Sequence, residues 1–170
     1  MNRAVQAPSV TLVSNHGRPA HVEEVLKKVA PLIESGEYTK ALELIGRSKG
    51  ESPWITNALG VCRLRMGTPA TAVEAFRGLV LASGGLILRS DVPTVFKTNY
   101  ATALLLAGNL EGATDVLREL GEEGGVRVRK LERAIANWKL GLSVWQKLNW
   151  FMGATPAKPV ELGFLPGDLE

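Results

Sequence analysis

Few side chains in this sequence have the type and spacing that catalysis or metal binding requires. His16 and His21 do not fall in a cluster of cysteine and histidine residues with metal-ligand spacing. The acidic pairs Glu23-Glu24 and Glu122-Glu123 are typical of helix first turns or solvated surface. The glycine-rich stretches lack the Lys-Ser or Lys-Thr of a phosphate loop, and each nucleophile lacks a recognisable base. We therefore expect a protein that is not an enzyme, with no catalytic residues, metal ligands or cofactors.

The composition is that of a folded, non-secreted chain. The chain has 170 residues, of which 45% are hydrophobic, and this length suits one compact domain with a real core. Its one cysteine, Cys62, has no partner for an internal disulfide, and its apolar neighbours predict a buried, inert thiol. The sequence shows neither a secretory signal pattern nor an apolar run of roughly 18 residues. We expect a soluble, cytoplasmic protein.

Hydrophobic residues recur at helical spacing through residues 19–152, which predicts an all-α domain. Three helical pairs are expected within residues 19–48, 53–80 and 94–120, followed by one long helix over residues 125–150. Residues 1–18 show no sustained period and predict an irregular N-terminal arm. Residues 153–170 hold three prolines and three glycines, which predict an extended tail.

A repeated pattern links the three helical pairs. Gly36, Gly67 and Gly108 lie where the first helix of each pair should turn into the second. Each glycine is followed five residues later by alanine and nine residues later by a larger apolar residue. These residues are Ala41, Ala72 and Ala113, then Ile45, Phe76 and Leu117.

The central pair resembles the tetratricopeptide repeat. It carries the Leu-Gly pair of that family at Leu59-Gly60, and Ala72 is followed four residues later by Phe76, as in the family's Ala-x3-Phe pattern. The resemblance covers about residues 20–121. It implies a right-handed stack of three helical hairpins, in which the long terminal helix covers the last exposed face.

The resemblance also implies a concave groove whose inner wall is formed by the first helix of each hairpin. Only Asn57 and Arg65 on this wall are of the polar kind that binds a free carboxylate in one subclass of the family, so an extended apolar segment is the expected ligand. The chain is then a non-catalytic adaptor or scaffold that binds another protein. The expected groove residues are Trp54, Asn57, Val61, Leu64, Arg65, Thr98, Thr102 and Leu105.

The tail itself is a candidate ligand for such a groove. Val160, Leu162 and Phe164 alternate along a segment that proline keeps extended, so their side chains can point one way. The tail could dock on its own chain, dock on a second copy, or be displaced by a partner. The large apolar content, with four tryptophans, makes a homo-oligomer plausible, and a symmetric dimer is its default form.

Two further segments each have two interpretations. Residues 81–92 carry the apolar patch Leu86–Leu88, which either covers the core between hairpins or gates the groove. In residues 124–152, six Lys or Arg residues against one Glu combine with tryptophans. This basic, aromatic helix either packs on the hairpins or binds an anionic membrane surface or nucleic acid.

Overall fold

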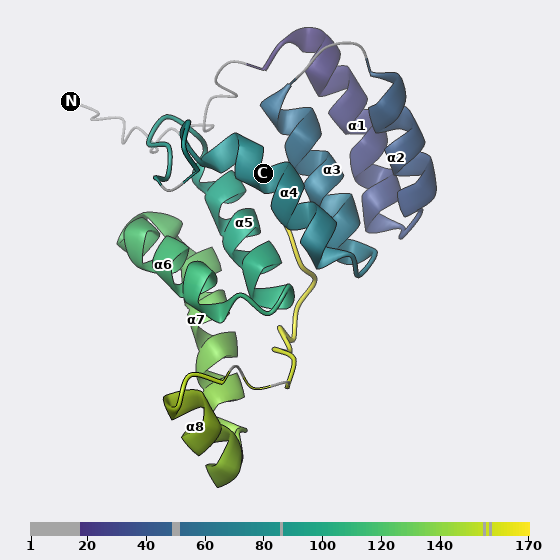
Figure 1. Ribbon diagram of the computed structural model, residues 1–170. Coiled ribbons are helices and arrows are strands. Elements are labelled where there is room, and N and C mark those ends of the chain that lie inside the picture. The colour runs from purple at the N-terminus through teal and green to yellow at the C-terminus, as the bar shows by residue number, and fades with distance from the viewer. Residues whose placement is uncertain (1–17, 49–51, 86, 155, 157) are drawn as a thin grey trace, which may run out of the picture.

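A computed structural model describes residues 18–48, 52–85, 87–154, 156 and 158–170 (Figure 1). Most of the expected N-terminal arm therefore lies outside the described residues. Those residues form an all-α fold, and their β structure is limited to one isolated bridge between Leu81 and Leu88. The helices are α1 (Ala20–Glu34), α2 (Tyr38–Arg47), α3 (Pro53–Arg65), α4 (Pro69–Val80), α5 (Thr94–Leu106), α6 (Leu110–Leu120), the short 3-10 helix η1 (Gly121–Gly124), α7 (Gly125–Leu140) and α8 (Val144–Phe151).

The three turn glycines adopt the same backbone conformation. Gly36, Gly67 and Gly108 have φ angles of 80°, 75° and 84°, in the left-handed region that favours glycine. In each turn, the residue after the glycine donates its N–H to the carbonyl five residues earlier, as Glu37 does to Leu32 at 2.8 Å. This is the Schellman ending of a helix, and it reverses the chain at the same place in all three hairpins.

Small residues allow the helices of each hairpin to approach closely. The three alanines that follow the turn glycines, Ala41, Ala72 and Ala113, are fully buried. In the central hairpin the buried ring of Phe76 lies against Gly60, where an added Cβ would come within 2.4 Å of the ring. The pairing of Gly60 with Phe76 therefore fixes how α3 crosses α4.

The first helices of successive hairpins are neighbours. Helix α1 contacts α3, α3 contacts α5, and α5 contacts α7. These four helices therefore line one side of the molecule, along which the tail runs (Figure 1). Helices α2, α4 and α6 pack behind them.

The expected single helix over residues 125–150 is wrong, because the structure divides it into α7 and α8. The chain leaves the helix after Leu140 at Gly141, and Ser143 begins the next one. The Ser143 hydroxyl accepts from the N–H of Gln146, whose side chain accepts from the N–H of Ser143 at 2.9 Å. This reciprocal capping box starts a new helix where the hydrophobic period alone predicts continuation.

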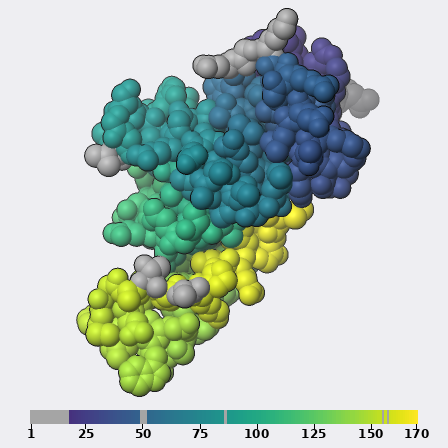
Figure 2. Space-filling model, turned by 45° about the vertical axis from the view of Figure 1, so that its right-hand side comes forward, coloured from purple at the N-terminus to yellow at the C-terminus, as the bar shows by residue number. Residues whose placement is uncertain are grey.

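Helix α8 stands out from the rest of the molecule (Figures 1 and 2). None of its residues is buried, although it is rich in large apolar side chains. Trp138 of α7 is buried and Trp150 meets it edge-on, with ring centroids 5.6 Å apart, but Trp145 is 74% exposed. The interpretation in which the tryptophans of this region pack on the hairpins therefore fails for Trp145.

The connection over residues 81–92 folds back on itself. Ala82 donates to the carbonyl of Ile87 at 2.9 Å, and Arg89 donates to that of Val80 at 2.8 Å. Leu88 is buried in the core, whereas Ile87 is 70% exposed. Leu86 lies outside the described residues. Leu88 therefore covers the core, as one of the two interpretations of this segment expects.

Burial at Cys62 leads to a pH-dependent prediction. Desolvation raises the pKa of the Cys62 thiol from 9.0 to about 11, an effect that the charge of Arg65 partly opposes. Since the folded-state pKa is the higher one, the buried neutral thiol contributes stability below pH 9 that is lost as the pH rises to about 11. The midpoint of urea unfolding should fall across that window. The fall should be smaller in Cys62→Ala, and an equal fall in that variant would assign it to other groups.

Candidate peptide-binding groove

Residues 158–170 of the tail lie along the side formed by α1, α3, α5 and α7, which we call the groove. Figure 1 shows this segment running from beside α8 past α5 toward α3, and Figure 2 shows it packed against the helices. The side chains of Val160, Leu162, Phe164 and Leu169 are partly buried against the core. The tail thus occupies the groove of its own chain in an extended form without regular secondary structure.

Two buried asparagines bind the backbone of the tail at Asp168. The Asn99 side chain accepts from the Asp168 N–H at 2.9 Å and donates to the Asp168 carbonyl at 2.7 Å. The Asn57 amide donates to the carbonyls of Asp168 and Leu169 at 3.3 and 3.4 Å. Asn99 also donates to the Asn57 Oδ1 at 2.8 Å, which holds the two amides in register. Both asparagines bond to the peptide backbone of the tail, so these bonds do not depend on the side chains of the tail.

Arg65 binds the preceding two peptide groups. Its Nε donates to the Pro166 carbonyl at 3.2 Å, and a terminal nitrogen donates to the Gly167 carbonyl at 3.1 Å. The same guanidinium forms an ion pair with Glu34 of α1 at 3.2 Å, and its side chain is only 7% exposed. Because Glu34 orients the fork, Arg65 presents two donors to the tail without further ordering.

Gly167 packs tightly against α3. It is buried with φ of 80°, and an added Cβ would lie 3.2 to 3.3 Å from methyl groups of Val61 and Leu64. Only glycine fits this position without strain, for reasons of both conformation and space. Val61 and Leu64 thus form the floor beneath this part of the tail.

The start of the docked segment is held at the other end of the groove. Trp138 donates its indole N–H to the Lys158 carbonyl at 2.8 Å, and Lys158 donates from Nζ to the Gly141 carbonyl at 2.9 Å. Lys158 therefore also satisfies a carbonyl left free where α7 ends. This contact ties the position of the tail to the break between α7 and α8.

Charged side chains close over the end of the tail. Arg127 of α7 pairs with the Asp168 carboxylate at 2.8 Å and also donates to the backbone oxygen of Glu170. Arg18 pairs with the Glu170 side chain at 2.6 Å. The guanidinium of Arg18 in turn lies 3.6 Å from the centroid of the Trp54 ring. The carboxylates of these two pairs are exposed to solvent, which weakens ion pairs. We therefore expect the pairs to fix the position of the tail along the groove more than to stabilise the fold.

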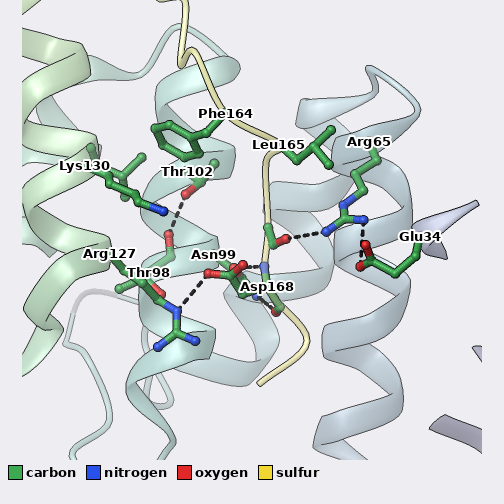
Figure 3. Close-up of a pocket in the computed structure, with 12 residues that line it drawn as sticks. Glu34, Arg65, Thr98, Asn99, Thr102, Arg127, Lys130, Phe164, Leu165 and Asp168 are labelled. Carbon is green, nitrogen blue, oxygen red and sulfur yellow. Dashed lines mark hydrogen bonds and ion pairs between the residues drawn. The ribbon is translucent and has the colours of Figure 1, made fainter. Parts of the chain in front are cut away.

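The remaining expected groove residues have different surroundings. Trp54 packs edge-on against Phe96, with centroids 4.8 Å apart. Thr98 and Thr102 are buried and donate within α5, and both line a pocket of about 330 Å³ beside the tail (Figure 3). Leu105 is buried and lines a second pocket together with Val160. The pocket in Figure 3 is lined both by helix residues and by Phe164, Leu165, Gly167 and Asp168 of the tail.

Sequence reasoning missed four residues that hold the tail: Arg18, Asn99, Arg127 and Trp138. One signal was available for Asn99, since an asparagine at the centre of a helix rich in apolar residues needs a hydrogen-bond partner if it is buried. Arg127 and Trp138 carried no such signal, because their role depends on where α7 lies relative to the hairpins.

The described residues supply hydrogen-bond donors and apolar contacts to an extended segment. Among them, no group of three or more His, Cys, Asp or Glu side chains is placed to hold a metal ion. Within the same part of the chain, no helix combines the length and hydropathy needed to cross a bilayer. Comparison with protein-family models, with curated proteins and with solved structures gave no match. The structure therefore defines an all-α protein with a groove that holds an extended segment of the same chain.

Proposed function

We propose that this chain is a non-catalytic adaptor of the cytoplasm that binds an extended segment of another protein in its groove. The observation that carries the proposal is the set of backbone contacts that Asn57, Asn99 and Arg65 make to residues 166–169. Such contacts hold any extended chain of suitable shape, while the apolar floor excludes water from them. The attached tail occupies the place of the partner's segment.

We also propose that the three hairpins form a right-handed stack like that of tetratricopeptide repeats. The shared glycine turns, the three buried alanines and the serial contacts of α1, α3 and α5 support this arrangement. Repeats of this kind present the inner helices as one continuous binding surface. The groove described above is that surface.

Competition by a free copy of the tail tests the binding function. An excess of a peptide with the sequence of residues 158–170 should displace the attached tail from the isotopically labelled full chain. Amide signals of Gly163 and Gly167 should then move to the positions of unstructured glycine. Since a short connection gives the attached tail an effective concentration on the order of mM, half-displacement should need a similar peptide concentration. A scrambled peptide is the control, and equal effects of both peptides would refute specific binding.

A second candidate function is favoured by the exposure of α8. Val144, Trp145, Phe151 and Met152 are 80%, 74%, 89% and 67% exposed, although all are apolar. Lys139 and Lys147 are exposed nearby, and residues 124–152 carry a net positive charge. Apolar residues beside lysines suit the surface of an anionic membrane, where rings enter the headgroup layer and cations remain in water.

Vesicle binding tests this second candidate. The full chain should bind vesicles that contain phosphatidylserine, with a blue shift of tryptophan fluorescence, and should bind neutral vesicles less. Trp145→Ala should weaken binding about tenfold or more, since burial of a large side chain contributes about 1.5–3 kcal/mol. Ile87→Ala, which removes an exposed apolar residue elsewhere, should have no effect. Salt-sensitive binding to nucleic acid without vesicle binding would reject the membrane and favour nucleic acid.

A further inference from the structure

The contacts at the end of the tail specify which residues a ligand must carry, beyond the requirement for an extended apolar segment. Four consecutive residues, 166–169, receive bonds from the groove through their backbones. Two of these residues are also selected by their side chains, or by the lack of one. The inference below rests on the proposed binding function and specifies the partner.

The first selected position is that of Gly167. Its φ of 80° and the 3.2 to 3.3 Å separation of an added Cβ from Val61 and Leu64 both disfavour any other residue. Val61 and Leu64 are themselves buried in the core, so they cannot move aside readily. A partner segment that uses the same backbone bonds must therefore place glycine here.

The second selected position is that of Asp168. Its carboxylate accepts from Arg127 at 2.8 Å, and the same arginine binds the backbone two residues later. The adjoining pocket is lined by three cationic side chains, Arg65, Arg127 and Lys130, against two carboxylates, one of which belongs to the tail itself (Figure 3). Without Asp168 the groove would hold excess positive charge, so it selects an acidic residue after the glycine.

Apolar contacts flank these two positions. Leu169 lines a pocket together with Leu26 and Ala30 of α1 and is partly buried against the core. On the other side, the Phe164 ring packs on the core, with the Lys130 ammonium 5.7 Å from its centroid. The pattern is therefore Gly-Asp with an aromatic residue three positions before the glycine and leucine directly after the aspartate, in one extended segment.

We propose that the external ligand of the groove is an extended protein segment with Gly-Asp between apolar residues, which binds by displacing residues 158–170. The attached tail carries the same pattern and competes from within the chain. Because the connection over residues 153–157 is short, a free segment competes against an effective concentration on the order of mM. Weakening of the attached tail therefore raises the apparent affinity for the partner.

Substitutions in the tail of the full chain weaken the attached competitor without changing any residue of the groove. In Gly167→Val the attached tail should lose its place, while every groove residue remains. A labelled peptide with the sequence of residues 158–170 should then bind at least about tenfold tighter than it binds the unaltered chain, as measured by fluorescence anisotropy. Ala154→Val introduces the same side chain at an exposed tail position outside the groove and should leave the affinity unchanged. Asp168→Lys is a second release variant, at an exposed position of the tail.

Peptides with altered sequences test the Gly-Asp requirement. They are added to the Gly167→Val chain, whose groove is no longer occupied by the attached tail. Peptides that carry valine for the glycine, or lysine for the aspartate, should each bind about tenfold or more weakly. If both bind as well as the original, the Gly-Asp requirement is wrong while the binding function stands. If no peptide binds either folded release variant, both proposals fail. If the unaltered chain forms a concentration-dependent dimer that Gly167→Val abolishes, the occupant is the tail of a second copy, and the partner proposed here is wrong.

Discussion

Replacement of Gly60 by alanine should lower the free energy of unfolding by about 1–3 kcal/mol, although alanine is the better helix former. The added Cβ would lie 2.4 Å from the Phe76 ring, which is fully buried and has no free space to enter. Helices α3 and α4 would have to separate, and the tail-binding wall lies on α3. Thermal or urea unfolding followed by circular dichroism measures the loss, at about 2–4 °C per kcal/mol for a chain of this size.

Two comparisons isolate the cause of this loss. Gly78→Ala, at an exposed glycine of α4 with nothing within 4 Å of an added Cβ, should instead stabilise the protein by about 0.4–1 kcal/mol. Phe76→Ala alone should cost about 3–5 kcal/mol, but it should make Gly60→Ala harmless in the double variant. If Gly60→Ala behaves like Gly78→Ala, the close crossing of α3 and α4 is wrong.

Replacement of Asn99 by alanine should release the end of the tail without unfolding the domain. The change removes both bonds to the Asp168 peptide group and the bond to Asn57, and leaves buried polar groups unpaired. Each such group costs about 1–3 kcal/mol, so opening of the tail should become about 5- to 150-fold more frequent. Hydrogen exchange of the Asp168 amide, which donates to Asn99, rises both through the lost bond and through opening of the tail. The amide signal of Gly167 separates the two effects, because it moves toward the position of unstructured glycine only when the tail opens.

Asn109 provides the matched control for Asn99. Its side chain caps α6 by accepting from the N–H of Gly112 at 2.9 Å, away from the tail. Asn109→Ala should therefore cost about 1 kcal/mol of overall stability and leave exchange at Asp168 unchanged. Equal acceleration of that exchange in both variants would mean that the tail opens only through global unfolding.

The hairpins could be predicted from sequence because their determinants are local. Apolar spacing sets each helix, and Gly36, Gly67 and Gly108 end the first helix of each pair through a bond that spans a few residues. The break at Gly141 was also locally encoded, by the Ser143 and Gln146 capping box. The hydrophobic period continues through that break, and an analysis of period alone misses it.

The path of the tail could be predicted only in part. The alternation of Val160, Leu162 and Phe164 indicated a segment able to pack on an apolar surface. The glycine and aspartate that meet the groove through specific contacts lie further along, at Gly167 and Asp168. Their partners Asn99 and Arg127 are 69 and 41 residues away from Asp168, so the pairing depends on the fold as a whole.

The groove residues and the tail that they hold lie far apart in the sequence, and this affects the order in which they are synthesised. Asn57 precedes Asp168 by 111 residues, so the hairpins that carry the wall are translated well before residues 158–170. At about 5–20 residues per second, the delay is on the order of several seconds, ample time for local helical hairpins to fold. During that interval the side chains of Asn57 and Asn99 have no tail backbone to bind.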